Sequence, residues 1–287
     1  MQRRALSPVL PEGEGVHNNE ETQFMSACET IQVVVADGVG TVTLDRPAVR
    51  NAFSETMIGD LTRAFVELGK NEHAKVVVLA AAGKAFCAGA DLNWMKKMAG
   101  YSEAENRADA LRLARMLKTI HDCPKPVVAR VQGDVYAGGT GLVAACDIAV
   151  CVREAVFCLS ETRIGLIPAT IGPYVIRAMG ERAARRYMLT AERFDAAEAL
   201  RVGFVHEVVD TDALDAAVKR CVDVLKVNSS NAMDETKRLI RDVATAPLDE
   251  ALLADTAGRI AAIRASDEGR EGIRSFLEKR KPSWVAQ

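Results

Sequence analysis

The 287-residue sequence predicts an α/β protein with a largely parallel sheet, followed by a helical C-terminal region. Residues 75–80 and 127–131 are apolar runs, typical of strands that are buried on both faces. A long segment with helical spacing of its apolar residues separates them. Strand, helix and strand in this order predict a right-handed crossover between parallel strands. From residue 180 onward the patterns are mainly helical.

The N-terminal part predicts a tail, a hairpin and a helix. Residues 1–27 are rich in polar residues, Pro and Gly and lack a continuous apolar run, which predicts a flexible tail and not a secretory signal. Residues 31–35 and 41–44 flank Asp37-Gly38, a strong hairpin signal. Ser54 has the position of an N-cap for the helix that follows.

The middle of the chain repeats the strand–turn–helix order. Ser102 and Glu105 have capping-box spacing and mark the start of the long helix between the two apolar strands. After residues 127–131, a glycine-bearing loop leads directly into a helix. Two more short strands are predicted at residues 148–152 and 156–159.

Four helices are predicted at the C-terminal end, over residues 210–227, 231–242, 248–265 and 267–281. The third is apolar around much of its circumference, so it is expected to pack on the core or on another subunit. The chain is therefore divided into a tail (1–27), an α/β core (28–208) and a helical region (209–287).

Composition excludes several classes of function. The formal net charge of -2 provides no reason to expect a nucleic acid partner. The seven cysteines form no CxxC pair and do not cluster with the four histidines, which argues for a reducing, cytoplasmic location and against a metal site. No apolar stretch reaches the length of about 20 residues that a membrane helix needs.

Two glycine-bearing loops predict an oxyanion hole. Gly89 allows a sharp turn after residues 75–80, and Gly138 opens a helix after the neighbouring strand. Loops at the carboxyl ends of adjacent parallel strands converge on one crevice, so the N–H groups of Ala90 and Gly138 are expected to point at one oxygen. On spacing alone, these glycines are equally well explained as tight turns.

A family resemblance strengthens this interpretation. Residues 84–92 (Lys-Ala-Phe-Cys-Ala-Gly-Ala-Asp-Leu) resemble the first oxyanion-hole motif of the enoyl-CoA hydratase/isomerase (crotonase) family. Residues 131–147 resemble its second oxyanion segment, and Ser160-Glu161 the segment with a catalytic glutamate. Residues 44–52 resemble its coenzyme A-contacting loop, and the C-terminal helices its tail. The resemblance covers nearly everything after residue 30.

The resemblance implies a spiral of ββα turns with a C-terminal trimerisation region, and a homotrimer or a dimer of trimers. It implies an acyl-CoA thioester as substrate, with coenzyme A entering as part of that substrate and no separate cofactor. Ala90 and Gly138 would hold the thioester carbonyl and Glu161 would move the proton. The substrate contacts that it implies come from Arg50, Ala52, Ala88, Gly89, Asp91, Leu92, Gly139, Gly141, Phe276 and Lys279, the last from a neighbouring subunit.

One position departs from the family pattern. Two-glutamate hydratases carry a second glutamate three residues after the second oxyanion glycine, where this chain has Gly141. The amino-acid sequences of residues 87–95, 138–144 and 166–170 resemble those of bacterial hydratases that act on methylglutaconyl-CoA or carboxygeranoyl-CoA. We therefore expect hydration by Glu161 alone, with Gly141 leaving room for a branched, carboxylated acyl group that Arg163 could pair with.

Other functions stay open at this point. A single carboxylate also suits a Δ3,Δ2-enoyl-CoA isomerase, because isomerisation needs only one shuttled proton. A non-catalytic acyl-CoA- or RNA-binding scaffold would retain the fold without turnover. A dinucleotide oxidoreductase is disfavoured, since residues 133–141 do not have GxGxxG spacing.

Overall fold

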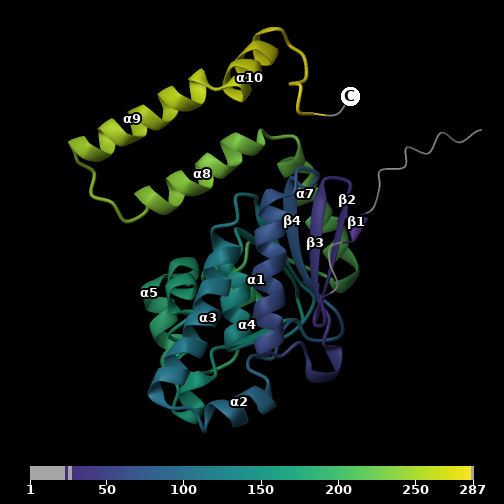
Figure 1. The fold of residues 1–287 in the computed structure, drawn as a ribbon, viewed down its shortest axis with the longest axis vertical. Coiled ribbons are helices and arrows are strands. Elements are labelled where there is room, and N and C mark those ends of the chain that lie inside the picture. Colours follow the sequence, from purple (N-terminus) through teal and green to yellow (C-terminus); the bar gives the residue numbers. More distant parts are fainter. Residues whose placement is uncertain (1–22, 25–27, 286–287) are drawn as a thin grey trace, which may run out of the picture.

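The computed structural model describes residues 23–24 and 28–285, and its main feature is a seven-stranded sheet (Figure 1). The strand order is β1-β2-β3-β4-β5-β7-β10, and the pairs from β3 to β10 are parallel. The strands are β1 (Gln23–Phe24), β2 (Ile31–Ala36), β3 (Val39–Leu44), β4 (Val76–Ala81), β5 (Val127–Val131), β7 (Ile148–Val152) and β10 (Glu207–Val209). The predicted parallel α/β core is confirmed.

The predicted hairpin is formed by β2 and β3. Asp37 and Gly38 both have positive φ, 50° and 76°, as a tight two-residue hairpin turn requires. The predicted tail needs a correction at its end, because Gln23–Phe24 pairs with β2 as strand β1. The other residues of the predicted tail, 1–22 and 25–27, lie outside the described residues.

Helices cross between the parallel strands as the caps predict. Helix α1 (Glu55–Lys70) begins after Ser54, whose side chain accepts from the Met57 N–H. Helix α3 (Glu103–His121) begins with the complete Ser102–Glu105 capping box. The sequence analysis missed helix α2 (Leu92–Met98), which Asp91 caps.

A second, three-stranded sheet makes the spiral. It contains β6 (Val135–Tyr136), β8 (Val156–Cys158) and β9 (Phe194–Asp195). Each turn gives one strand to the large sheet and the next to the small one, before helix α4 (Gly138–Ala145) or α5 (Gly172–Thr190) returns. The repeated ββα unit is the predicted fold class, and crotonase-fold structures match it below.

The helical part begins earlier than predicted and divides in two. Helix α5 starts at Gly172, before residue 180, and is kinked at Gly180. After α6 (Ala196–Arg201), helix α7 (Leu214–Lys226) packs on the large sheet through buried residues that include Leu214, Val218 and Val222.

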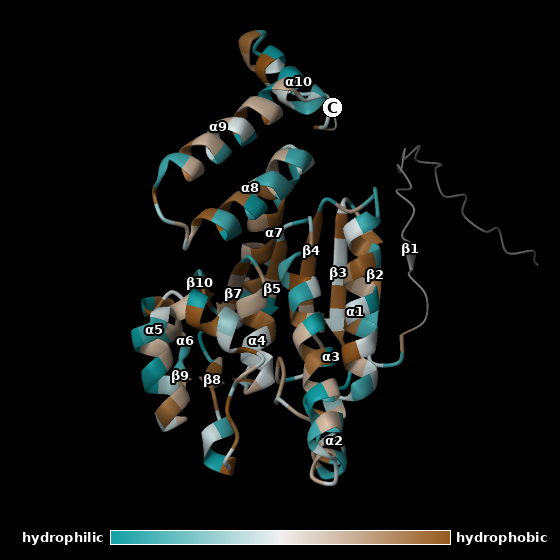
Figure 2. Cartoon of the chain, turned by 60° about the vertical axis from the view of Figure 1, so that its left-hand side comes forward, coloured by the Kyte–Doolittle hydropathy of each residue, from teal (hydrophilic) through white to brown (hydrophobic). Residues whose placement is uncertain are grey.

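Helices α8 (Ser230–Val243), α9 (Glu250–Ala265) and α10 (Asp267–Leu277) form an arm that extends from the core (Figure 1). Among the described residues, helices α8 and α9 contain no buried residue, and α10 contains one, Ser275. Apolar residues occur along the whole arm (Figure 2), and several of them, including Ile240, Leu253 and Ile260, are exposed. Helix α9 therefore does not pack on the core, which leaves another subunit as the alternative predicted for it.

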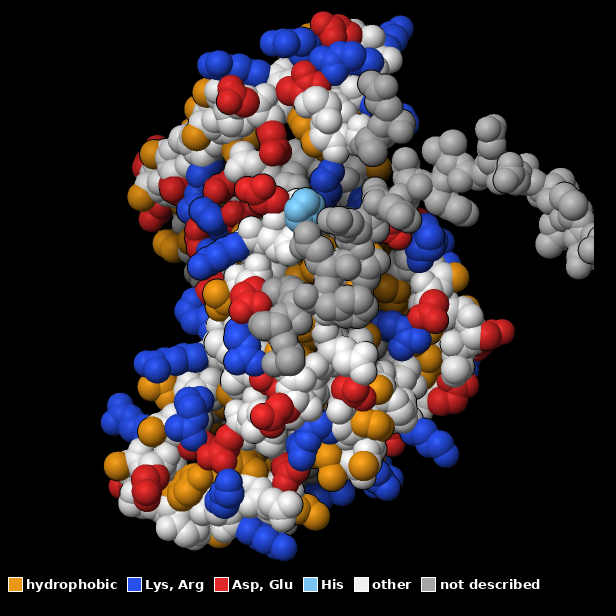
Figure 3. All heavy atoms as spheres, turned by 45° about the vertical axis from the view of Figure 1, so that its right-hand side comes forward, with side chains coloured by type: hydrophobic (Ala, Val, Ile, Leu, Met, Phe, Trp, Pro, Cys, Tyr) orange, Lys and Arg blue, Asp and Glu red, His pale blue; other side chains and the backbone are white. Residues whose placement is uncertain are grey.

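The described surface shows mixed charge, without a membrane-spanning helix or a metal-binding cluster among the described residues. On the face shown in Figure 3, acidic and basic side chains are interspersed. Within residues 23–24 and 28–285, no helix has the length and apolar character to cross a membrane. The same residues contain no cluster of three or more His, Cys, Asp or Glu suited to a metal.

Candidate active site

The first predicted loop is held on both sides by backbone pairing. Phe53 N–H donates to Gly89 O at 2.7 Å, and Asp91 N–H donates to Phe53 O at 2.8 Å. Ala88 N–H donates to Arg50 O at 2.9 Å. The Ala90 N–H lies between these bonds and has no acceptor among the described residues.

The second predicted loop presents its N–H through a strained residue. Ala137 has φ 46° and ψ -121°, which is unfavourable for a residue with a Cβ and costs about 1–3 kcal/mol. Gly138 is the first residue of α4, so its N–H has no partner within the helix. It also donates to nothing else in the described part of the chain. Strain of this size at a free amide is typical of a functional site.

The two loops run side by side. Cys87 and Val135 are partners in a parallel bridge, and Ala90 and Gly138 each follow their bridge residue by three positions. Gly89 has φ 90°, and a Cβ there would lie 3.0 Å from the Cβ of Ala137. The two unbonded N–H groups therefore belong to segments that run side by side, and an oxyanion hole formed by both stays a prediction.

Glu161 follows strand β8, which pairs with the strand that leads into the Gly138 loop. Strands β6 and β8 are parallel, with Tyr136 opposite Cys158, so Gly138 and Glu161 follow the same ends of two paired strands. The Oε2 atom of Glu161 is buried and has no hydrogen-bond partner among the described residues. This burial raises the pKa of Glu161, and a hydrogen bond from its own backbone amide offsets the effect only in part.

The carboxylate of Asp91, a predicted substrate contact, is bonded within the chain. Its carboxylate pairs with Arg46 at 2.8 Å and caps α2 through the Asn93 N–H. Arg46 also donates to Ala52 O at 2.6 Å. Burial alone would raise the pKa of Asp91, but the bonds from Arg46, Asn93 and Trp94 outweigh it and lower the pKa. Asp91 therefore positions the Ala90 loop.

Asn51 belongs to the same hydrogen-bonded network as Arg46, and it was not among the predicted site residues. It is fully buried with φ 54°, and its side-chain amide donates to the carbonyls of Ala82 and Ala85. Its Oδ1 accepts from the Arg46 N–H at 2.8 Å. A motif match was the only sequence signal for this residue, because buried asparagine has no periodicity.

Two neighbouring cavities open beside the Ala90 loop. One, of about 470 Å³, is lined by six residues of the predicted site: Arg50, Ala52, Ala88, Ala90, Asp91 and Leu92. The other, of about 510 Å³, shares Ala48, Arg50 and Ala88 with it. The lining cations Arg50, Lys84 and Lys96 form no ion pair within the described residues. The sequence analysis did not select Lys84 or Lys96 as site residues.

The expectation that Gly141 leaves room for a branched substrate is wrong. A Cβ at Gly141 would lie 2.2 Å from Cγ2 and 2.8 Å from Cβ of Ile171. Gly141 is buried and Ile171 is only 1% exposed. The side chain of Ile171 therefore fills the space that Gly141 leaves. Gly139 has no Cβ, which lets α4 approach Cys87. A Cβ added at Gly139 would lie 2.8 Å from the Cβ of Cys87.

Two other side chains have surroundings that bear on the roles considered for them. Arg163 donates to Ala191 O at 2.6 Å and so braces the segment that follows Glu161. Burial raises the pKa of the Cys87 thiol to about 12, so it stays protonated and is no nucleophile.

The last two predicted contacts are not brought to the site within one chain. Phe276 is 82% exposed, and Lys279 follows it with φ 54° beyond the end of α10. Helix α10 contacts α9 and α8, and it lies at the opposite end of the molecule from α2 (Figure 1).

The geometry is that of an enzyme active site: two free backbone N–H donors, a buried carboxylate with an unpaired oxygen, and cavities with unpaired cations. Residues 35–287 match the family model described as "Enoyl-CoA hydratase/isomerase". The chain belongs to this family, and the prediction of an enzyme of the crotonase type is confirmed.

Individual relatives agree over most of their length. The chain is 34% identical over 245 residues to a "Putative enoyl-CoA hydratase" from Thermus thermophilus, covering 85% of this chain and 96% of that protein. Among solved structures, an enoyl-CoA hydratase from Shewanella pealeana is 45% identical, with a TM-score of 0.87 over 90% of this chain and 96% of the other. Pseudomonas aeruginosa AtuE is 36% identical, with a TM-score of 0.86 over 90% and 100%.

Proposed function

We propose that this enzyme adds water to an α,β-unsaturated acyl-CoA thioester. The N–H groups of Ala90 and Gly138 hold the thioester oxygen, and Glu161 takes a proton from the attacking water. The observation that carries the proposal is the buried, unpartnered Oε2 of Glu161 beside two free amides. A carboxylate with a raised pKa accepts and returns protons near neutral pH more readily than an exposed one.

The proposed reaction balances around one carboxylate. Water oxygen bonds to the β-carbon while Glu161 removes one water proton, and the π electrons of the double bond move toward the thioester oxygen. The two N–H donors stabilise the resulting enolate. The α-carbon then receives the proton from Glu161, and the net change is the addition of one water.

Coenzyme A is the proposed carrier because the two cavities supply unpaired cations. Arg50, Lys84 and Lys96 line the space next to Ala88 and Ala90. Lysine and arginine are the side chains that bind phosphates, and the coenzyme has several. The Ala88 carbonyl is the proposed acceptor for the adenine amino group.

A branched carboxylated substrate such as 3-methylglutaconyl-CoA remains part of the proposal. Its support is the motif resemblance, since Ile171 fills the space over Gly141 and Arg163 bonds to Ala191 O. The competing function is Δ3,Δ2-enoyl-CoA isomerase. Ile171 packs against Gly141 and so leaves no space for a second carboxylate at position 141. This packing favours the isomerase, which needs only one carboxylate.

A substrate comparison separates these functions. Purified enzyme is incubated with 3-methylglutaconyl-CoA and with a 3-enoyl-CoA, and the products are analysed by mass. Hydration increases the product mass by one water, whereas isomerisation leaves it unchanged. Binding of both thioesters without turnover would contradict both activities.

The variant Glu161→Gln tests the carboxylate directly. We expect kcat to fall by about 10²–10⁴-fold while the affinity for the thioester is kept. Because burial raises the pKa of Glu161, ionisation costs stability as pH rises through the folded-state pKa. Glu161→Gln is therefore expected to raise Tm at neutral pH. Glu154→Gln, at an exposed turn between β7 and β8, is the matched control.

The pH profile gives a second test of the same residue. Activity needs ionised Glu161, so kcat/KM is expected to fall on acidification, with a midpoint above the usual glutamate pKa of about 4.3. A midpoint at or below that value would assign the proton transfer to another group.

A further inference from the structure

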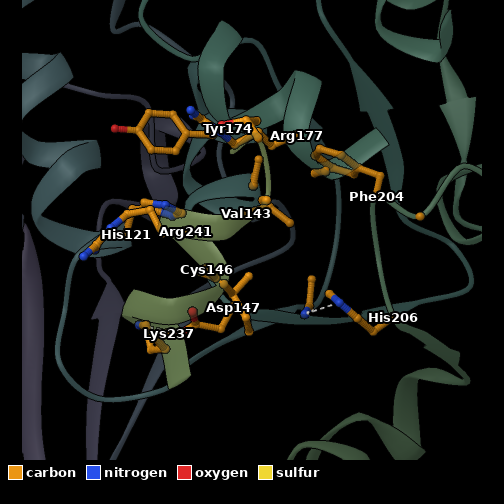
Figure 4. Close-up of a pocket in the computed structure, with 17 residues that line it drawn as sticks. His121, Val143, Cys146, Asp147, Tyr174, Arg177, Phe204, His206, Lys237 and Arg241 are labelled. Atoms are coloured by element: carbon orange, nitrogen blue, oxygen red, sulfur yellow. Dashed lines mark hydrogen bonds and ion pairs between the residues drawn. The ribbon is translucent and has the colours of Figure 1, made fainter. Parts of the chain in front are cut away.

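A separate cavity of about 550 Å³ lies at the carboxyl end of α4, whose amino end forms the candidate active site. Its walls come from the end of α4, from α5 and from α8, so the arm forms one side of it (Figure 4). The volume falls within the usual range for small-molecule sites. Neither the candidate mechanism nor the proposed coenzyme contacts use any residue of this cavity.

The lining combines an apolar surface with cationic groups. Val143, Ala149 and Phe204 are buried apolar residues of the core side, and Ile240 lies opposite on α8. Arg177, Lys237 and Arg241 are the lining cations, whereas Asp147 is the one lining acid. A cavity of this kind suits a ligand with an apolar body and a negative charge.

The three cations differ in their partners. Lys237 pairs with Asp147 at 2.6 Å, and Arg241 pairs with Asp122 at 3.2 Å. Arg177 forms no ion pair with any described residue, and among these residues its one hydrogen bond is to Pro173 O at 3.2 Å. Arg177 is therefore the guanidinium that is available for a carboxylate, which it can bind in a bidentate way.

Neighbouring groups support an anion at Arg177. Tyr174 lies one turn earlier on the same face of α5, and its ring contacts His121 edge-on at 5.3 Å (Figure 4). Burial raises the pKa of Tyr174, so its hydroxyl stays protonated as a donor. Burial lowers the pKa of His121, so this ring is neutral at pH 7 and adds no charge.

We propose that this cavity binds a small monocarboxylate with an apolar tail, whose carboxylate lies on Arg177 and whose tail lies against Phe204 and Ile240. Such a ligand contacts the core and α8 together. Its binding therefore adds to the attachment of the arm, to which the ion pairs Lys237–Asp147 and Arg241–Asp122 and the hydrogen bond from Lys237 to Lys125 O also contribute. This inference does not depend on the proposed function.

Calorimetric titration with octanoate tests the site, and octanamide is the uncharged probe of matched shape. We expect octanoate to bind and octanamide to bind at least about tenfold more weakly, because the charge-assisted bond is lost. Hydrogen exchange of the α8 amides is expected to slow when octanoate is present.

Three variants locate the binding. Arg177→Gln is expected to weaken octanoate binding by about tenfold, whereas Arg182→Gln, an exposed arginine on the same helix, leaves it unchanged. Ala178→Phe fills the cavity without changing its charge and is expected to abolish binding. Equal binding of octanamide, no measurable octanoate binding, or octanoate binding that survives both Arg177→Gln and Ala178→Phe would overturn the proposal.

Discussion

The loop around Ala90 and the arm that carries Phe276 and Lys279 are anchored in opposite ways. The loop is paired with residues 50–53 on one side and bridged to Val135 on the other, and Asp91 fixes its end through Arg46. The arm meets the core mainly through polar contacts of α8, and α10 contacts other arm helices. Phe276 and Leu277 are 82% and 73% exposed.

This difference separates chemistry from assembly. The segments that carry the proposed amide donors and Glu161 are positioned by bonds within one chain, so the proposed proton transfer needs no residue from a second subunit. The arm exposes apolar side chains that a monomer in water would not favour, which supports the proposed homotrimer or dimer of trimers. Variants in the core are therefore expected to change kcat, whereas variants in the arm change substrate binding and association.

Ala90→Pro is expected to have the largest effect on the core side. Proline removes the Ala90 N–H, which makes no backbone bond within the described residues, so the ladder to Phe53 is kept. Loss of one oxyanion donor costs about 10²–10³-fold in kcat. We expect this loss in steady-state kinetics with little change in Tm.

Ala88→Pro is the matched comparison for that variant. The Ala88 N–H donates to Arg50 O, so its removal breaks a bond of the ladder. We expect a clear fall in Tm for Ala88→Pro. If Ala90→Pro behaved in the same way, or kept full activity, the Ala90 donor would have no catalytic role.

Arg46→Met tests whether the ion pair positions the loop. It leaves the carboxylate of Asp91, which is 8% exposed, without its cation and also removes the bond to Ala52 O. Breaking a buried pair from one side costs about 3 kcal/mol of unfolding free energy. The pKa of Asp91 is lowered in the folded state, so this contribution is present at neutral pH and is lost as pH falls through that pKa.

The double variant Arg46→Met/Asp91→Asn provides the control. It removes the unpaired charge, so denaturant unfolding should show part of the stability restored, while kcat stays reduced because the loop is no longer held. Full recovery of kcat in the double variant would show that the pair serves stability alone.

Gly141→Glu is expected to have a smaller effect, on packing. The new side chain meets Ile171 at contact distances that no structure tolerates, and overpacking of this kind costs about 1–3 kcal/mol. Gly141→Glu/Ile171→Ala should recover much of that loss in denaturant unfolding. If Gly141→Glu alone is as stable as the parent, Ile171 does not fill this space in solution.

Much of the fold followed from local signals. The hairpin at Asp37-Gly38 and the capping box at Ser102 and Glu105 depend on a few residues in direct contact, and both are confirmed. The start of α5 was missed, since Gly172 and Pro173 follow an irregular segment and the helix is kinked at Gly180. Strand β1 was not predicted, because two residues are too few to show the alternating pattern of a strand.

The segments that carry the candidate site were predictable from backbone signals. The bridge between Cys87 and Val135 and the pairing of Tyr136 with Cys158 bring together the segments that lead to Ala90, Gly138 and Glu161, whose joint role stays a prediction. The role of Gly141 could not be predicted, because it depends on Ile171, thirty residues away in sequence. The same holds for Asp91, whose partner Arg46 comes from a different turn of the spiral.

The smallest expected effect tests the arm. Lys279 is exposed just beyond the end of α10, and in the proposed oligomer it meets a coenzyme phosphate of a neighbouring site. An exposed charge pair contributes up to about 1 kcal/mol, so Lys279→Ala should raise KM about fivefold and leave kcat unchanged. Lys281→Ala, two residues away and also exposed, is the matched control.

Mixed oligomers decide which subunit Lys279 serves. Subunits with Glu161→Gln lack the carboxylate but keep Lys279, whereas subunits with Lys279→Ala keep Glu161. If Lys279 reaches a neighbouring site, assembling the two variants together gives active sites whose KM returns toward the parent value. An unchanged, raised KM in the mixture would place Lys279 at its own chain's site or at none, and the core and arm would then not complete one another across subunits.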